Sequence, residues 1–129
     1  MKLPTAKEEM LERFRLFGEL FCLCYELAEG DCDCDIEGFK VDFDFDICDV
    51  LDLNSDDDPL RLDCGQDDEP DEVDFMGIEV DDRSMVMLGF QGANYPFSQP
   101  AIYTPSATLQ RVLDLLRRYA DELNKEGWV

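Results

Sequence analysis

Apolar residues recur at helical spacing near both ends of the chain. Over residues 5–29, two neighbouring apolar stripes predict one long helix, which opens at a capping box that begins with Thr5. Over residues 105–125, one apolar stripe is flanked by opposite charges spaced four apart, as on a helix with one side in water. Thr104 as the N-cap and Pro105 as the first helical residue mark its start. The pattern predicts a broadly apolar first helix and an amphipathic last helix.

Between the helices the pattern changes to the alternation that is typical of β-strands. Residues 32–36 alternate apolar and acidic positions, and residues 39–47 do the same in the opposite phase. A two-residue hairpin loop at Glu37 and Gly38 explains the change of phase and keeps both apolar faces on one side of the sheet. On the polar face, the resulting register pairs Asp35 with Lys40, Asp33 with Asp42, and Asp31 with Asp44.

Two of these three pairs on the polar face of the hairpin bring carboxylates together. Directly opposed residues have Cβ atoms about 4.5–5.5 Å apart, which is less than the Debye length of about 8 Å at physiological salt. Salt therefore leaves the repulsion largely in place, and sequences tend to break a local rule in this way at functional sites. The alternative is a solvent-facing surface whose aspartates guard the sheet against edge aggregation.

The remaining signals complete an α+β plan within one domain, residues 1–129. Further strands are predicted at 60–64, 75–80 and 85–90, within an acidic β region of residues 31–90. Residues 91–104 combine prolines with aromatic residues, which predicts an ordered loop or edge excursion rather than regular structure. We expect an antiparallel sheet of about four to five strands with both helices on one face. The opposite, acidic face is left to water.

Composition makes this acidic face the dominant chemical feature. The chain has 129 residues and is 45% hydrophobic and 11% aromatic, which is enough for a single core. Its formal net charge is -21, and residues 31–82 hold twenty-two acidic side chains against Lys40 and Arg61. Such a charge argues against direct binding to nucleic acid or to an anionic membrane, and it favours a basic partner or a cation.

The residue types that most catalytic sites require are missing. The chain has no histidine, which is the commonest general base and metal ligand, and it has no Gly-rich phosphate loop or nucleophile motif. We therefore expect no enzymatic activity, no cofactor and no metal. Two Cys-x-Cys pairs, Cys22 with Cys24 and Cys32 with Cys34, are expected to be buried thiols, because their geometry on a helix and a strand does not suit one zinc ion.

The N-terminal segment favours a cytoplasmic location with reduced thiols. It carries acidic residues where a signal peptide needs an uninterrupted apolar run. The most apolar window, residues 16–28, is 13 residues long and includes Glu19 and Glu26. A bilayer requires about 20 apolar residues, so no transmembrane segment is expected.

A partial match to the EF-hand calcium loop is one alternative for the acidic hairpin. Asp31, Asp33 and Asp35 occupy loop positions 1, 3 and 5, followed by an acidic residue at position 7. Position 6 is Ile36 instead of glycine, and position 12 is Asp42 instead of a bidentate glutamate. The alternation of a strand explains the same spacing, so calcium binding ranks behind binding of a protein.

The acidic surface can imitate nucleic acid. Two rows of strand carboxylates, about 6.7 Å apart along a strand and about 4.8 Å apart between strands, approach the duplex DNA spacing of one charge per about 1.7 Å of axis once acidic loops are added. In size, acidity and lack of catalytic motifs, the chain is similar in kind to small phage or mobile-element inhibitors that mimic DNA to block restriction or CRISPR effectors. It shares no motif with them.

We therefore expect a non-enzymatic inhibitor that binds the basic nucleic-acid site of a partner protein. The candidate partner-binding residues are Asp31, Asp33, Asp35, Asp42, Asp44, Asp46, Asp56, Asp57, Asp58, Asp67, Asp68 and Glu69. Two alternatives remain besides calcium binding. One is an immunity protein that neutralises a cognate basic toxin or nuclease, and the other is an adaptor or assembly protein, including a homodimer, that uses the apolar first helix.

Overall fold

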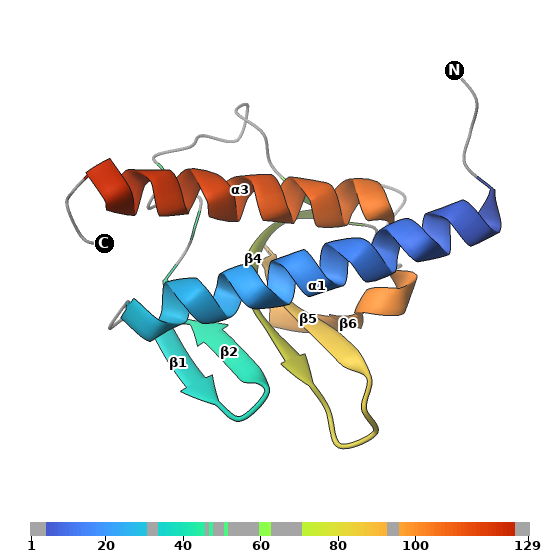
Figure 1. The fold of residues 1–129 in the computed structure, drawn as a ribbon, viewed down its shortest axis with the longest axis horizontal. Coiled ribbons are helices and arrows are strands. Elements are labelled where there is room, and N and C mark those ends of the chain that lie inside the picture. Colours follow the sequence, from blue (N-terminus) through green and yellow to red (C-terminus); the bar gives the residue numbers. More distant parts are fainter. Residues whose placement is uncertain are drawn as a thin grey trace.

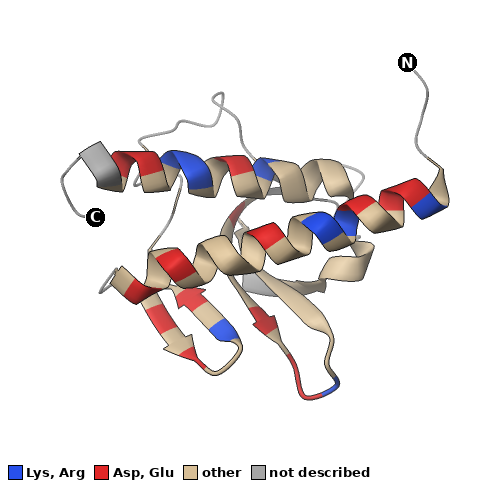
Figure 2. Cartoon of the chain, viewed as in Figure 1, with Lys and Arg blue, Asp and Glu red and all other residues tan. Residues whose placement is uncertain are grey.

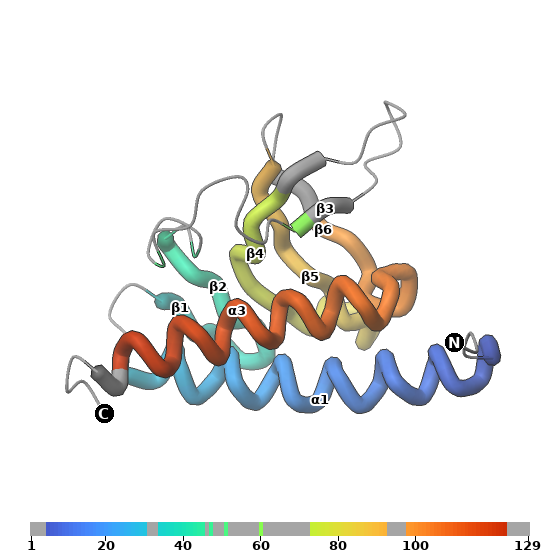
Figure 3. Tube along the Cα trace, turned by 90° about the horizontal axis from the view of Figure 1, so that it is seen from above, coloured from blue at the N-terminus to red at the C-terminus, as the bar shows by residue number. Residues whose placement is uncertain are grey.

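Two helices cover one face of an antiparallel sheet in the computed structural model of the protein (Figures 1 and 3). The structure describes residues 5–30, 34–45, 47, 51, 60–62, 71–92 and 96–125. The helices are α1 (Ala6–Gly30) and α3 (Ser106–Lys125), with a 3₁₀ helix η1 (Ala101–Tyr103) before α3. The strands are β1 (Cys34–Glu37), β2 (Lys40–Phe43), β3 (Leu60–Leu62), β4 (Asp71–Val80), β5 (Val86–Gly92) and β6 (Pro96–Pro100). The expected α+β class is confirmed.

Strand β4 organises the sheet. Within the described residues the sheet has six strands in the order β1-β2-β4-β5-β6, and β3 also pairs with β4. One edge of β4 pairs with β5, while the other edge pairs with β3 near its start and with β2 near its end. A strand of ten residues spans about 33 Å, so one edge has room for both short neighbours. This arrangement holds the β1–β2 hairpin beside the second half of β4.

The core lies between the helices and the inner face of the sheet. Phe43, Phe75 and Phe90 come from three neighbouring strands. The ring centroids of Phe43 and Phe75 are 6.3 Å apart, and those of Phe75 and Phe90 are 5.8 Å apart. Phe45 continues this cluster to Tyr119 of α3, with centroids 4.9 Å apart. Aromatic pairs of this kind contribute about 0.5–1.5 kcal/mol each beyond their burial. Because alternate residues of a strand face opposite ways, this core directs the intervening polar residues to the outer face.

The β1–β2 hairpin forms in a different register from the one predicted. Glu37 pairs with Lys40, so the two-residue loop is Gly38 and Phe39. The predicted loop at Glu37 and Gly38 is therefore wrong. The first residue of a type II′ turn needs a positive φ, and Gly38 supplies it with a φ of +57°, so Gly38 is the first loop residue and not the second. Phe39 is therefore a turn residue, 69% exposed, and not part of the apolar face. In the observed register, Asp42 pairs with Asp35 instead of Asp33, a shift of two residues along β1. Because side chains alternate between the faces, Asp35, Lys40 and Asp42 remain on the polar face.

Other boundaries differ from the prediction as well, and β4 begins at Asp71 rather than at residue 75. Strand β2 ends at Phe43 instead of residue 47, because the chain bends at 44–45 and the Ile47 N–H donates to Asp74 Oδ2 at 2.9 Å. The segment 91–104, predicted to lack regular structure, contains β6 and η1. β6 pairs only with β5 among the described strands, and prolines are tolerated in such an edge strand because it needs fewer N–H donors.

Helix α1 also caps helix α3. The predicted capping box of α1 is confirmed by reciprocal hydrogen bonds between Thr5 and Glu8. Helix α3 begins at Ser106 and not at Pro105, and the Thr104 hydroxyl donates to a backbone carbonyl instead of capping the helix. The cap comes from α1, because Glu9 accepts hydrogen bonds from the Ser106 N–H at 2.8 Å and from the Ser106 hydroxyl at 2.7 Å.

Candidate functional site

Three of the twelve candidate residues lie in the part of the chain that the structure describes. Asp35 and Asp42 stand directly opposite each other across β1 and β2, and Asp44 follows on the exposed side of the bend after β2. The predicted pairs of Asp33 with Asp42 and Asp35 with Lys40 are replaced by this one. The other nine candidates lie outside the described residues: Asp31, Asp33, Asp46, Asp56, Asp57, Asp58, Asp67, Asp68 and Glu69.

Lys40 lies within a group of carboxylates on this outer face. Its Nζ is 3.2 Å from Asp42 Oδ2, and it pairs in register with Glu37 on one side and Glu79 on the other. The hydrogen bond that Lys40 donates to the Asp42 carboxylate raises the pKa of Lys40, and the negative charges of Asp42, Glu79 and Glu37 raise it further. One cation thus neutralises only part of the surrounding charge. Counting Asp35, the outer face of β1, β2 and β4 keeps a surplus of carboxylates.

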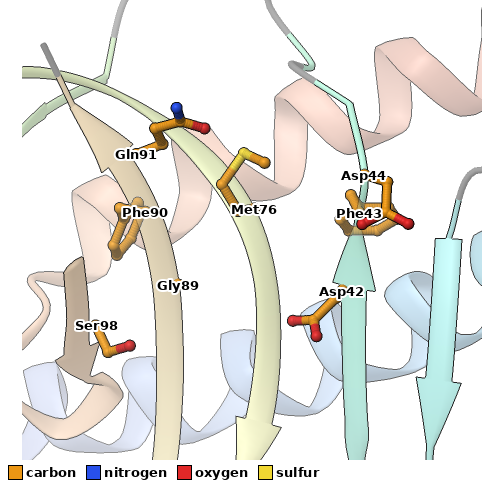
Figure 4. Close-up of a pocket in the computed structure, with 8 residues that line it drawn as sticks. All are labelled: Asp42, Phe43, Asp44, Met76, Gly89, Phe90, Gln91 and Ser98. Atoms are coloured by element: carbon orange, nitrogen blue, oxygen red, sulfur yellow. The ribbon is translucent and has the colours of Figure 1, made fainter. Parts of the chain in front are cut away.

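The outer face is hollowed next to Asp42 (Figure 4). A groove of about 490 Å³ is lined by Asp42, Phe43, Asp44, Met76, Gly89, Phe90, Gln91 and Ser98. The two aspartates stand on one side of it, and Gln91 and Ser98 on the other. In register across four strands, Asp42 is followed by Gly77, Gly89 and Ser98. Gly89 lines the groove, and its neighbour in register, Gly77, also lacks a side chain, so the backbone of the sheet forms part of the groove floor.

A second hollow adjoins the first on the hairpin. It has a volume of about 430 Å³ and is lined by Asp35, Ile36, Glu37, Lys40 and Asp42. Asp42 lines both hollows. The carboxylate surface is therefore concave on both sides of Asp42, which suits projecting basic side chains better than a flat surface.

Gly77, Gly89 and Glu79 belong to this surface, and the sequence reasoning missed them. The pairing of β4 with β5 shifts register between Phe75 and Gly77, so Met76 is the extra residue of a β-bulge. A Cβ at Gly77 would lie 2.2 Å from the Val41 carbonyl oxygen, which no real side chain tolerates. The sequence does carry a signal for this feature, because Gly77 and Gly89 lie inside two predicted strands, and a glycine within a strand often marks a bulge or a close backbone approach.

The charges of the helix layer are mixed, in contrast to the hairpins (Figure 2). Figure 2 shows Lys and Arg mainly on α1 and α3, whereas the β1–β2 hairpin and the end of β4 are mostly acidic. On the helices, Arg15 forms ion pairs with Glu12 and Glu19, and Arg117 lies 3.7 Å from Glu19. Within the described part of the chain, the acidic surplus is therefore concentrated on the sheet side.

No protein-family model, curated protein or solved structure matches the chain. The candidate site is consequently defined by its geometry and charge alone.

Calcium binding by the acidic hairpin stays an untested alternative. Among the described residues, no group of three or more Cys, Asp or Glu side chains is placed to hold a metal ion. Two of the three residues of the calcium alternative, Asp31 and Asp33, lie outside the described residues.

None of the described helices is both long enough and apolar enough to cross a bilayer.

The two cysteines of α1 point to opposite sides of the helix. Cys24 is fully buried, and burial raises the pKa of its thiol, so it stays protonated and packs as a small apolar side chain. Cys22 is exposed, so the prediction that both thiols are buried is wrong for this residue. Positions two apart on a helix are separated by about 200°. The pair therefore cannot bind one metal ion.

Proposed function

We propose that this protein is a non-enzymatic inhibitor that binds the basic nucleic-acid-binding site of a partner protein through the outer face of its sheet. The observation that carries the proposal is the opposition of Asp35 and Asp42 in register, with Asp44 and Glu79 beside them and Lys40 as the nearby cation. Opposed carboxylates destabilise a sheet. A surface that keeps them gains from a partner whose cations neutralise them.

The spacing of these carboxylates supports imitation of a nucleic acid. Neighbouring strands lie about 4.8 Å apart, and each strand of DNA carries one phosphate per about 3.4 Å. The two hollows beside Asp42 would receive arginine or lysine side chains that otherwise contact phosphates. Attraction over several ångströms would also speed association at low salt. Inhibitors of restriction or CRISPR effectors from phages or mobile elements act by such imitation, and we propose the same class here.

A cytoplasmic location is part of this proposal. It is supported by the two α1 thiols, Cys22 and Cys24, which form no disulfide, since cytoplasmic proteins keep their thiols reduced. The absence of histidine supports a role in binding and not in catalysis.

Two variants with the same loss of charge test the proposal. In the sheet variant, Asp35, Asp42 and Asp44 are changed to Asn. In the control variant, three exposed acidic residues of α3 are neutralised by Asp114→Asn, Asp121→Asn and Glu122→Gln. Each protein is immobilised and used to capture proteins from a cell lysate at 50 and 200 mM salt, and the captured proteins are identified by mass spectrometry.

We expect wild type and the control variant to capture the same nucleic-acid-binding protein, and the sheet variant to lose it. Exposed ion pairs contribute about 0.2–1 kcal/mol each, so three of them predict roughly a 3- to 150-fold weaker Kd. Added duplex DNA or RNA should displace the captured protein. Equal capture by both variants would contradict the proposal. Capture that depends on the sheet but ignores nucleic acid would favour the immunity protein instead.

A further inference from the structure

Among the described residues, nothing packs over one long stripe of helix α1. Figure 3 shows α1 at the outer edge of the molecule, with α3 and the sheet on its other side. Leu11 and Phe14 lie on this stripe and are each 58% exposed. Clustered exposed apolar side chains of this size mark interaction surfaces in soluble proteins.

Small residues continue the same stripe towards the C-terminal half of α1. Gly18 is exposed in the middle of the helix, and a Cβ at this position would meet nothing within 4 Å. Glycine in a helix interior is less favourable than alanine, so contacts within the described residues do not explain it. Cys22 lies one turn further along and is exposed as well. One half of the stripe thus carries the large side chains of Leu11 and Phe14, and the other half begins with the small residues Gly18 and Cys22. In an antiparallel pair, the large half of each copy would face the small half of the other.

The charges of the stripe are complementary in the same sense. Lys7 lies on the stripe near its start and Glu29 lies on it near its end, and both are exposed. Two antiparallel copies that cross at Gly18 would bring residue i of one copy opposite residue 36 minus i of the other. Each Lys7 would then face Glu29 of the second copy. In a parallel pair, like charges would face each other at both ends.

We propose that two copies of this chain associate through the outer stripe of α1, antiparallel and crossing at Gly18. Phe14 of each copy packs over Cys22 of the other, and Leu11 packs against Tyr25, which is half-buried in its own chain. The absent side chain at Gly18 lets the two helices approach closely at the crossing point. This surface is separate from the acidic face, so the dimer would present two acidic faces to partners.

The acidic faces of the two copies would lie far apart in this dimer. The acidic residues of β1 and β2 face away from α1, because the opposite face of these strands carries the buried Val41 and Phe43. Two sheets and two helix layers would be stacked in the dimer, with three spacings of about 10 Å between them, so the acidic faces would lie about 30 Å apart. This exceeds the Debye length of about 8 Å at physiological salt.

Sedimentation or light scattering between 5 and 200 µM tests the dimer. For wild type we expect a mass that rises from 14.8 kDa towards twice that value. Phe14→Ser should weaken association at least tenfold, whereas Phe39→Ser, in the hairpin turn and 69% exposed, should leave it unchanged. Gly18→Ala should also weaken association while raising the denaturation midpoint, a combination that a merely structural glycine would not produce. Lys7→Glu should weaken association, and adding Glu29→Lys should restore it.

A cysteine at the crossing point tests the geometry. Gly18→Cys should give a reducible dimer under mild oxidation at 200 µM, because the two Cα atoms meet at the crossing and the disulfide traps the pair even though the added side chain weakens it. Wild type should not crosslink through Cys22, because its two copies lie about 12 Å apart along the helices, beyond the roughly 7 Å that a disulfide can bridge. Asp82→Cys, in the exposed β4–β5 turn, is the control for random collision. A monomer at 200 µM, or crosslinking of Gly18→Cys no faster than that of the control, would overturn the proposal. Neither result bears on the acidic face.

Discussion

At Gly77 the sheet leaves no room for a side chain. A Cβ there would lie 2.2 Å from the Val41 carbonyl oxygen and 3.1 Å from the Cα of Asp42. Gly77→Ala should therefore force β2 away from β4 and lower the free energy of unfolding by about 2 kcal/mol or more. Denaturation in urea measures the change. The same shift would displace Asp42, so this one glycine positions the central carboxylate of the candidate site.

Gly89 is the matched control, since it pairs with Gly77 on the next strand. A Cβ there would have no neighbour nearer than 3.8 Å, which is an ordinary contact distance. Gly89→Ala should change the free energy of unfolding by no more than about 1 kcal/mol, while it narrows the floor of the groove. Equal destabilisation by the two substitutions would show that backbone crowding at the bulge is not what requires Gly77.

At the scale of elements, Glu9 links the start of α1 to the start of α3. Its hydrogen bonds from the Ser106 N–H and hydroxyl lower the pKa of the Glu9 carboxyl. A depressed carboxyl pKa stabilises the fold above the unfolded pKa, about 4.3 for glutamate, and this contribution is lost as pH falls through the folded pKa. Glu9→Gln should lower the free energy of unfolding by roughly 0.5–2 kcal/mol at pH 7, as for the loss of a helix cap.

The pH dependence distinguishes this contribution from those of the other carboxylates. The difference in unfolding free energy between wild type and Glu9→Gln should be constant above about pH 5 and shrink below the ordinary glutamate pKa of about 4.3. Denaturation curves of both proteins at pH 3, 4, 5 and 7 supply the comparison. A difference that persists unchanged at pH 3 would mean that the charge of Glu9 does not act through Ser106.

The elements differ in how well the sequence predicts them, and the reason is the range of the interactions involved. The helices were predicted to within one residue, because a 3.6-residue pattern over twenty positions is a local signal. The register of the β1–β2 hairpin was not predicted. Loops at Glu37–Gly38 and at Gly38–Phe39 give the same alternation of side chains, and the φ of Gly38 distinguishes them. Strand β6 was missed because its two prolines favour a loop unless the strand lies at an edge.

The site was predicted only in part for the same reason. Asp35, Asp42 and Asp44 follow from local alternation and lie on the predicted face. The groove beside them could not be predicted from the hairpin, because its lining also comes from β4, β5 and β6, which are distant in the sequence. Glu9 reaches Ser106 across 97 positions of the sequence. Such partners are known only once the packing of the elements is known.

At the scale of the whole molecule, the uneven distribution of charge predicts that salt stabilises the fold. The chain carries a net charge of -21, and the described part of that charge is concentrated on the sheet side, where Asp35 and Asp42 are directly opposed. Unfolding separates these charges. Raising monovalent salt from 10 to 150 mM shortens the Debye length from about 30 to about 8 Å, which removes the longer-range part of the repulsion from the folded state.

We expect the melting temperature to rise by at least about 3 °C over this range, since 1 kcal/mol corresponds to about 3–6 °C for a chain of this size. Measurements at two protein concentrations separate screening from self-association, because only association makes the melting temperature depend on concentration. Calcium chloride at equal ionic strength separates screening from a calcium site, since a bound ion would add stability beyond that of sodium. Asp35→Asn with Asp42→Asn should reduce the salt response, because it removes two charges whose longer-range repulsion of the other carboxylates is what added salt screens. A melting temperature that stays flat in sodium chloride would mean that the folded acidic face carries little repulsion, and the reason to expect a basic partner would then be lost.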